Sequence, residues 1–278
     1  MPAIPKLLWI VENFTDGSDY NDLIKEIKSQ NFDVLEIRRD FKRSMIADIK
    51  NRPVIFQGSI EMTAMLGGEL HLQNCWPVKY CSIENYKCSK YYSYFGHHLF
   101  NDNYALLSLS ELYRQHYNIW GNYGKEGLIF IRPDRGDKPF QAQLLDLLDV
   151  KRFVEKHEDL KHELVLVSTP KKIVGEWRFV VTKNKEILGY SLYFYQGQIT
   201  KVPSAPIEAI NKCKEILKIN YYPDDVFVVD ICEDAAGDYW LLELNSFSSA
   251  GLYECNKQKI VEVVSKMAID SFEKNGHS

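Results

Sequence analysis

The 278-residue sequence lacks several features that would place it in a particular class of protein. No apolar run approaches the roughly 20 residues that a membrane-spanning helix needs. The N-terminus has only a short apolar segment, followed at once by acidic residues, so it predicts a first strand and not a signal peptide. The formal net charge is −4, which gives no electrostatic basis for binding nucleic acid or an anionic membrane. We therefore expect a cytoplasmic globular protein with neither partner.

The cysteines offer no metal-binding spacing. None of the six cysteines belongs to a C-x-x-C pair; they are Cys75, Cys81, Cys88, Cys213, Cys232 and Cys255. This pattern argues against a structural zinc site, although the local group of Cys75, Cys81 and Cys88 leaves a metal role as the less favoured alternative. We expect reduced, structural thiols, as is usual for cytoplasmic proteins.

The common catalytic and phosphate-binding motifs are also missing. The sequence has no G-x-G-x-x-G and no Walker-type G-K-[ST], so the two commonest phosphate loops are excluded. It has no H-R-D or D-F-G, which excludes protein-kinase chemistry. No K-x-D-G and no Ser/His/Asp or Cys/His arrangement is recognisable. A nucleic-acid ligase is therefore disfavoured, and the sequence offers no arrangement for a side-chain nucleophile.

The composition that remains is ordinary for a protein with packed cores, at 45% hydrophobic and 26% charged residues. The first ninety residues alternate between expected strands at 6–11, 33–38 and 53–59 and expected helices at 18–30 and 60–70. Strand–helix–strand order predicts a small parallel α/β unit. Residues 76–103 show only weak periodicity and read as a connection to the next unit.

The rest of the sequence predicts two further α+β units. The middle unit has expected helices at 110–117 and 150–157 and expected strands at 128–131 and 162–169. The last hundred residues favour an antiparallel sheet, with strands at 175–182, 186–195, 225–233 and 238–245 and helices at 206–217 and 257–272.

Polar residues interrupt three of the apolar strands near the C-terminus. Glu176 and Arg178 are two residues apart, as are Glu243 and Asn245, so each pair shares one face of its strand. The short segment EDAAGD joins the last two strands as a hairpin, which can place Asp230 across from Glu243 and Asn245. Two carboxylates and an amide oxygen are suitable Mg²⁺ ligands. The alternative is a solvent-facing polar row on a half-exposed sheet.

A second group of charges lies in the segment IRPDRGDKPF. Arg132 ends an apolar strand, and Lys138 follows a tight turn. Two cations at a strand end are a plausible grip on phosphate oxygens. The alternative is a charged surface turn, in which Asp134, Arg135 and Asp137 have no further role.

The order of these features resembles the ATP-grasp superfamily between about residues 128 and 247. The order along the chain is a basic segment, an apolar strand, E-W-R, a lone Asp and E-L-N. Phosphate-binding, hinge and metal-binding segments follow one another in the same order in that family. R-P-x-x-x-x-K-x-F is similar to a bacterial and phage branch of it. Two departures are an arginine, Arg132, where a lysine is usual, and the lack of a Gly-rich loop between Lys138 and the hinge.

The resemblance implies a role for each matching position. Arg132 and Lys138 would hold phosphates, the hinge strand with Glu163, Val165, Leu166, Val167 and Ser168 would contact adenine, and Glu176 would lie near the ribose. Arg178 would lie near the transferring phosphate, and Lys201 is a further candidate phosphate contact or a surface lysine. Asp230, Glu243 and Asn245 would bind two Mg²⁺ ions, with Mn²⁺ as a possible substitute. Arg178 and Lys138 are the candidate catalytic residues.

The resemblance also implies an architecture and an activity. We expect an α+β ATP-grasp fold with a pre-grasp α/β domain at 1–95, a first lobe at 96–171 and a second lobe at 172–278. The expected activity is ATP- and Mg²⁺-dependent joining of a small-molecule or peptide carboxylate to an amine or thiol through an acylphosphate, with release of ADP. The alternatives are a phosphotransferase that uses the same cleft and a non-catalytic ATP-binding protein.

Overall fold

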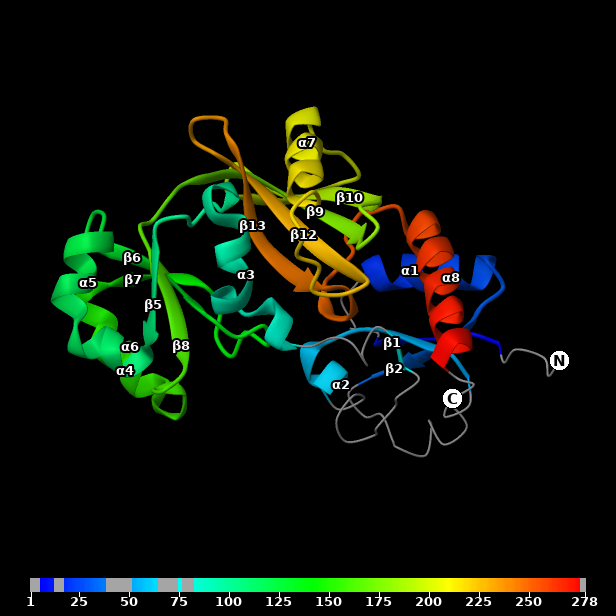
Figure 1. Ribbon diagram of the computed structural model, residues 1–278, viewed down its shortest axis with the longest axis horizontal. Helices are drawn as coiled ribbons and strands as arrows, with labels where there is room; N and C mark the ends of the chain where they lie inside the picture. Colours follow the sequence, from blue (N-terminus) through cyan, green and yellow to red (C-terminus); the bar gives the residue numbers. More distant parts are fainter. Residues whose placement is uncertain (1–5, 13–17, 39–51, 65–74, 77–82, 276–278) are drawn as a thin grey trace.

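The computed structural model describes residues 6–12, 18–38, 52–64, 75–76 and 83–275, and it contains three sheets (Figure 1). The expected helix at 60–70 is described as far as Ala64, and Cys81 lies outside the described residues. Within the described part of the chain, no helix has the length and apolar character required to cross a bilayer. The α+β class expected from the sequence is confirmed, since helices and largely antiparallel sheets occur together.

The N-terminal sheet is parallel, as predicted, with the strand order β2-β1-β3-β4. Its strands are β1 (Leu8–Glu12), β2 (Asp33–Ile37), β3 (Val54–Gln57) and β4 (Cys75–Trp76). The helices of this unit are α1 (Ser18–Ser29) and α2 (Ile60–Ala64). β1 and β3 are buried on both faces, which explains why they read as continuous apolar runs in the sequence.

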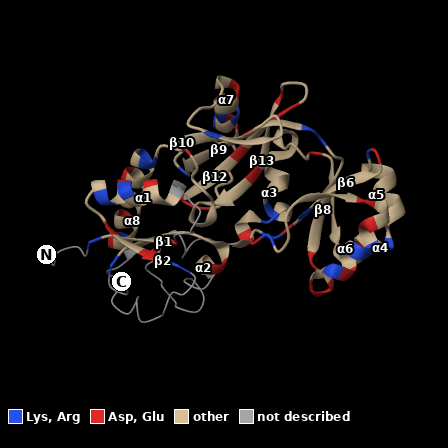
Figure 2. Ribbon diagram, turned by 180° about the vertical axis from the view of Figure 1, so that it is seen from behind, with Lys and Arg blue, Asp and Glu red and all other residues tan. Residues whose placement is uncertain are grey.

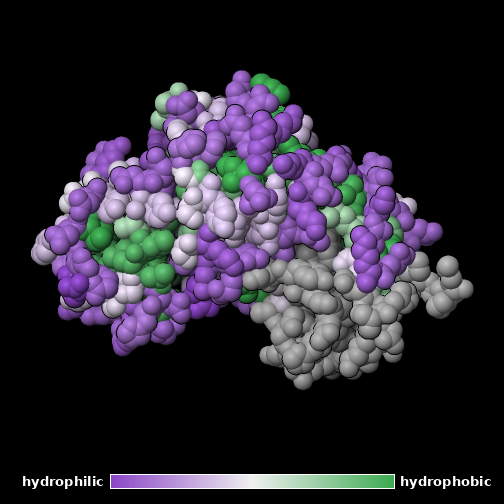
Figure 3. Space-filling model, in the orientation of Figure 1, coloured by the Kyte–Doolittle hydropathy of each residue, from purple (hydrophilic) through white to green (hydrophobic). Residues whose placement is uncertain are grey.

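A four-stranded sheet with the order β5-β8-β6-β7 forms the middle of the sequence, and its pairs are antiparallel. The strands are β5 (Tyr104–Ser108), β6 (Leu128–Pro133), β7 (Gln143–Asp146) and β8 (Leu164–Ser168), and one face is covered by α4 (Leu109–Arg114), α5 (His116–Tyr123) and α6 (Val150–Lys156). On the side of the molecule drawn in Figure 3, hydrophobic residues gather over this unit among hydrophilic ones. Strands β5 and β7 were not predicted. They lie at the two edges of the sheet, and β7 has only four residues.

The central sheet has five strands in the order β11-β10-β9-β12-β13. They are β9 (Ile173–Thr182), β10 (Ile187–Tyr195), β11 (Gln198–Val202), β12 (Val226–Asp234) and β13 (Tyr239–Ser246), and the helices packed around them are α3 (Cys88–Phe95), α7 (Ile207–Ile216) and α8 (Lys257–Asn275). All its pairs are antiparallel, as predicted, and β11 is an additional edge strand.

Both faces of the central sheet are covered. One face packs with α1, α8 and the N-terminal sheet in a single apolar cluster. The other face packs with α7 and with residues 86–99, so part of the segment expected to be a connection forms a wall of this core. Since the clusters join sheets from different parts of the sequence, the three-part division expected from the sequence stays a proposal about domains.

The N-terminus of α3 is fastened to the loop that follows β6. The Asp134 carboxylate is buried and accepts hydrogen bonds from the Ser89 amide (2.6 Å) and the Ser89 hydroxyl (2.6 Å). The Asp134 carbonyl accepts a third bond, from the Cys88 amide (3.1 Å). Lys87, the residue before the helix, supplies no side-chain cap. Asp134 therefore satisfies N–H groups that the helix itself leaves unpaired, and it is not surface charge.

Replacing Asp134 with alanine should lower the free energy of unfolding by about 1–3 kcal/mol, because the helix loses a buried, charged cap. Ser89→Ala removes one of the two side-chain bonds and should cost less. Asp137→Ala, in the same loop, breaks a partly exposed pair with Arg135 and should cost less than about 1 kcal/mol. Urea titration compares the three variants; equal losses for Asp134→Ala and Asp137→Ala would contradict the capping role.

Candidate functional site

The polar positions of the three central strands lie in one row across the sheet. Asp230 on β12 pairs with Arg178 on β9 and with Glu243 on β13. The predicted proximity of Asp230 to Glu243 is therefore confirmed by the strand register. Figure 2 shows acidic positions on β12 and β13 in the middle of the molecule.

A β-bulge sets the direction of the last two side chains in the row. Asp230 pairs with Glu243, but Ile231 pairs with Leu241, so Leu242 is an extra residue in β13. Leu241 and Leu244 are both buried in the same apolar cluster although they are three positions apart. Strict alternation would place Leu241 and Glu243 on one face. The bulge allows both leucines to enter the core while Glu243 points to the opposite face.

Arg178 and Asp230 form a buried, two-point ion pair. Arg178 Nε donates to Asp230 Oδ1 (2.9 Å) and Nη2 donates to Oδ2 (2.7 Å), and the Asp230 side chain is 0% exposed. Arg178 Nη1 donates to the Gly251 carbonyl (3.0 Å). The guanidinium carbon lies 5.3 Å from the Tyr193 ring centroid and 4.9 Å from that of Tyr253. The arginine is therefore fixed by hydrogen bonds at its edge and by aromatic rings beside it.

Glu243 contacts two cationic side chains from the four-stranded middle sheet, one on β6 and one in the loop that follows it. Lys138 Nζ lies 3.0 Å from both carboxylate oxygens, and Arg132 Nη2 lies 3.2 Å from Oε2. Lys138 Nζ also donates to Asn245 Oδ1 (2.7 Å). The Lys138 backbone has φ of +48°, an uncommon conformation for a residue with a side chain, and it presents the lysine from the loop between β6 and β7.

Asn245 connects the two carboxylates. Its Nδ2 group donates to Asp230 Oδ2 (2.9 Å) and to Glu243 Oε1 (2.9 Å), while its Oδ1 accepts from Lys138. The six residues predicted as phosphate-holding cations, arginine and metal ligands therefore form one continuous network: Arg132, Lys138, Arg178, Asp230, Glu243 and Asn245.

The two carboxylates differ in acidity because their surroundings differ. Burial raises the pKa of Asp230, and the Arg178 guanidinium opposes this shift. Burial acts in the same direction on Glu243, but Lys138 and Arg132 outweigh it, so the pKa of Glu243 lies below its ordinary value. Glu243 therefore stays ionised, which suits a ligand for cations.

The oxygen set fits a magnesium ion only with help from a bound ligand. Among the described residues, no three His, Cys, Asp or Glu side chains are grouped as a metal site. Two carboxylates and one amide oxygen remain, and Mg²⁺ commonly binds one or two protein carboxylates together with substrate phosphates. Lys138 Nζ, within 3.0 Å of Glu243 and Asn245 oxygens, shows that these atoms already hold a cationic group. The donor set is thus compatible with magnesium bound beside a polyphosphate.

Glu176 lies on β9 two residues before Arg178 and pairs across the sheet with Cys232. Burial raises the pKa of Glu176 to about 7, and a hydrogen bond with Tyr193 partly opposes the shift. Tyr193 contacts both Glu176 and Arg178, and its ring stacks on Tyr253 at 5.2 Å. No local pattern pointed to the two tyrosines, since aromatic residues are frequent throughout the chain.

The expected hinge strand corresponds to β8, which is an interior strand. β5 and β6 pair with it on both sides, so the backbone groups of Val165, Val167 and Ser168 are occupied by the sheet. The Val165 and Val167 side chains point into the helix-covered core, whereas Leu166 faces the central sheet's cluster. The backbone of β8 is thus engaged by its neighbouring strands, and the adenine contacts expected of this strand stay a prediction.

Two further predicted residues lie outside the network. Glu163 precedes β8, and its carboxylate contacts Arg135 (3.4 Å). Lys201 on β11 lies at the other side of the site, with Nζ 5.1 Å from the ring centroid of Tyr253. Lys201 is therefore connected to Arg178 through an aromatic ring, and Glu163 has no described contact with the six-residue network.

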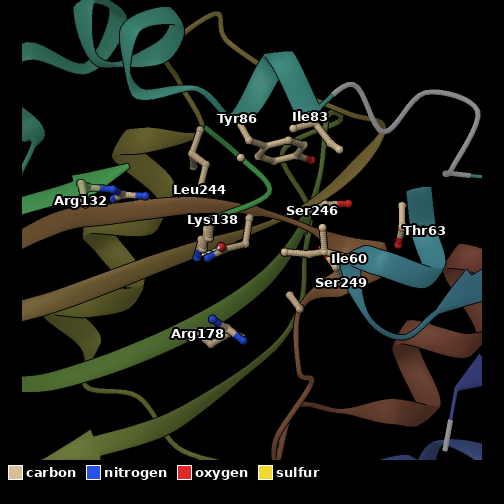
Figure 4. A pocket seen from close by; sticks show the side chains of 13 residues that line it. Ile60, Thr63, Ile83, Tyr86, Arg132, Lys138, Arg178, Leu244, Ser246 and Ser249 are labelled. Atoms are coloured by element: carbon tan, nitrogen blue, oxygen red, sulfur yellow. Dashed lines mark hydrogen bonds between the residues drawn. The ribbon is translucent and has the colours of Figure 1, made fainter. Parts of the chain in front are cut away.

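A pocket of about 170 Å³ opens beside the network (Figure 4). Arg132, Lys138, Arg178 and Asn245 contribute to its lining. The other lining residues come from α2, the 3₁₀ helix η3 (Ile83–Tyr86), the loop after β6 and the end of β13 with the turn η7 (Phe247–Ser249). The predicted site residues therefore border a cavity that the N-terminal unit helps to close.

The raised pKa of Glu176 makes a testable contribution to stability. Its folded-state value of about 7 exceeds the ordinary 4.5, so the folded protein binds more protons between these values and its free energy of unfolding falls as the pH rises through them. Glu176→Gln removes this loss. The free energy of unfolding of the variant, relative to that of the wild type, should therefore rise by about 1–3 kcal/mol between pH 4.5 and 7.5. Urea titrations measure it, and Glu208→Gln, exposed on α7, should show no such trend.

Solved structures with a similar architecture include ATP-grasp proteins, so the ATP-grasp fold expected from the sequence is confirmed. D-cycloserine synthetase DcsG superposes with a TM-score of 0.64 at 11% identity, over 94% of this chain and 99% of that chain. D-alanyl-alanine synthetase A from Vibrio cholerae superposes with a TM-score of 0.60 at 14% identity, over 97% of this chain and 99% of that chain. The ATP-grasp ligase PsnB, solved with its minimal precursor, superposes with a TM-score of 0.55 at 11% identity, over 93% of this chain and 98% of that chain. These similarities establish the fold.

The sequence itself identifies the family. Comparison with curated proteins gives no match. The model of the ATP-grasp domain, R(2)K clade family 2, matches residues 114–263, which include every member of the six-residue network. Because this match spans more than half of the sequence, the chain belongs to this clade family of ATP-grasp domains.

Proposed function

We propose that the protein is an ATP- and Mg²⁺-dependent ligase that joins a carboxylate to an amine and releases ADP. The observation that carries the proposal is the meeting of Arg132 and Lys138 from one sheet with Glu243 and Asn245 from another within 3.2 Å. Cationic side chains that can bind phosphate thus lie in the same place as oxygen atoms that can bind a metal ion. Membership of the ATP-grasp family supports ATP as the nucleotide.

We take the roles of the individual residues from the ATP-grasp resemblance, and the contacts of the network are compatible with them. Lys138 and Arg132 hold the phosphates, and Arg178 neutralises charge on the transferring phosphoryl group. Glu243, with Asp230 and Asn245, would hold two magnesium ions, which supply charge neutralisation for the polyphosphate when bound. Glu176 is assigned to the ribose side, and Lys201 to an outer phosphate contact.

The proposed reaction has two steps. A carboxylate oxygen attacks the γ-phosphorus of ATP, the bond between that phosphorus and the β–γ bridging oxygen breaks, and ADP leaves. The amine nitrogen then attacks the acyl carbon, the acyl C–O bond breaks, phosphate leaves and the amine loses a proton. Positioning and neutralisation of charge are sufficient for both steps, so no side-chain nucleophile is required.

The named activities of similar structures support the choice of an acid and an amine as substrates. D-alanine–D-alanine ligase of Bacillus anthracis has been solved with ATP, and PsnB with a precursor peptide. A thiol acceptor, a phosphotransferase and a non-catalytic ATP-binding protein remain the alternatives. The cytoplasmic location expected from the sequence stays a prediction.

Product analysis tests the proposed reaction. We expect ADP and phosphate, not AMP and pyrophosphate, with formation that depends on ATP, Mg²⁺, an acid and an amine together. Pools of carboxylates and amines are incubated with the protein, and the nucleotides are separated by chromatography. ADP formed with a hydroxyl compound and no acid would indicate a phosphotransferase instead, and bound ATP without turnover would indicate a non-catalytic protein.

Glu243→Gln tests the charge at the centre of the network. The change keeps the size of the side chain but removes the charge that faces Lys138 and Arg132, and turnover should fall by at least about 10²-fold. Stabilisation of the protein by Mg²⁺ and ATP should also shrink, because the variant binds them less tightly. Kinetics and thermal unfolding measure the two effects, with Glu208→Gln as the matched control. Normal turnover by Glu243→Gln would refute the proposed site.

A further inference from the structure

The pocket beside the network has two chemically different ends. Arg132, Lys138 and Arg178 form one end, and Figure 4 shows them on the side opposite Ile60 and Thr63. Arg178 uses three of its five N–H groups for Asp230 and Gly251, so its remaining donors are available to a ligand. This end of the pocket is suited to an anionic group.

The other end is apolar with a few hydroxyl groups. Its apolar surface comes from Ile60, Ile83, Ala250 and the Tyr86 ring. Hydroxyl groups are contributed by Thr63, Ser246 and Ser249. A ligand that fits both ends has a negative charge at one side and a largely apolar body at the other.

The volume limits the size of that body. A cavity of about 150 Å³ can hold a benzene molecule, so about 170 Å³ holds one compact group of roughly six to eight non-hydrogen atoms. Pockets that hold larger ligands measure about 300–1,000 Å³. The adenine and ribose of ATP therefore lie outside this pocket, and only the acyl part of a small acid fits within it.

The wall formed by η3 is held firmly, which makes the size limit effective. The Tyr86 hydroxyl donates to Asp224 (2.8 Å), Asn85 Nδ2 donates to the Pro223 carbonyl (2.9 Å), and the Tyr221 hydroxyl donates to the Asn85 carbonyl (2.6 Å). Gly136 packs against the same wall so closely that an added Cβ would lie 2.7 Å from the Ile83 carbonyl oxygen. Widening the pocket on this side would break several of these contacts.

We propose that this pocket binds the acyl part of the acid substrate, and that the acid is a free monocarboxylate with a compact, mainly apolar body. The carboxylate lies toward Arg178 and Lys138, and the body contacts Ile60, Ile83 and the Tyr86 ring. This inference rests on the proposed ligase function, which it extends by naming the class of acid. It excludes large aromatic acids, and peptide termini are excluded by the same size limit.

Substitutions of Ile60 test the proposal by changing the size of the pocket. Ile60 is half-buried at the start of α2, so a larger side chain can be accommodated without overfilling a core. The acids compared are acetate, 3-methylbutanoate, benzoate, 2-naphthoate and a dipeptide with a free C-terminal carboxylate, with hydroxylamine as a general amine and ADP formation as the readout. Wild type should favour 3-methylbutanoate and benzoate over 2-naphthoate and the dipeptide by at least tenfold in kcat/KM.

Ile60→Trp should lower kcat/KM for benzoate at least tenfold and leave that for acetate within about threefold. Ile60→Ala should raise it for 2-naphthoate. Ile207→Trp, at a 59%-exposed position on α7, is the matched control and should leave kcat/KM unchanged for benzoate and for 2-naphthoate. Equal use of 2-naphthoate and benzoate by the wild type, a preference for the dipeptide, or an equal loss for all acids in Ile60→Trp would each overturn the proposal.

Thermal unfolding separates this proposal from the ligase function. Benzoate should add stability to wild type saturated with Mg²⁺ and a non-hydrolysable ATP analogue, and it should add none to Ile60→Trp. If this pattern holds and no acid yields ADP, the pocket assignment stands and the ligase reaction is wrong. If acids yield ADP with no dependence on their size, the reaction stands and the pocket assignment is wrong.

Discussion

The Glu243 carboxylate is the group on which the arrangement of the site depends. Its side chain is only 19% exposed, and Lys138 and Arg132 of another sheet neutralise its charge. Asp230, fully buried, depends on Arg178 in the same way. A charge in such surroundings is costly unless it is paired, so the sheets are held in the relative position that keeps every charge paired. The site and the packing of its sheets are therefore stabilised by the same contacts.

Much of this fold could be predicted because the strands of the central sheet alternate strongly and their connections are short. The turn between β12 and β13 leaves few alternatives for the pairing of Asp230 with Glu243. Strand β5 could not be predicted, since all its residues are half-buried and it shows no alternation. Residues 86–99 were also missed, because their apolar side chains acquire a face only when they pack on β9, β12 and α7.

The site was predictable to the extent that its chemistry follows from local spacing. Glu176 with Arg178 and Glu243 with Asn245 are pairs whose common face follows from strand geometry alone. Contacts between distant segments were not predictable: Asp134 capping α3 and Tyr253 beside Arg178 join parts of the chain 45 and 75 residues apart. The position of β8 between β5 and β6 is likewise a property of the sheet order, which no local pattern encodes.

The bulge at Leu242 means that the site depends on a residue count as well as on residue types. A regular strand that kept Leu242 would turn both Glu243 and Asn245 toward the apolar cluster, with every side chain of the site still present in the sequence. Deletion of Leu242 would instead restore one-to-one pairing and leave both side chains on the face of the site. A length difference of one residue at this point of β13 is therefore compatible with the site, because a bulge accommodates the extra residue. Alignment gaps in this region thus have a structural meaning that residue identity alone does not reveal.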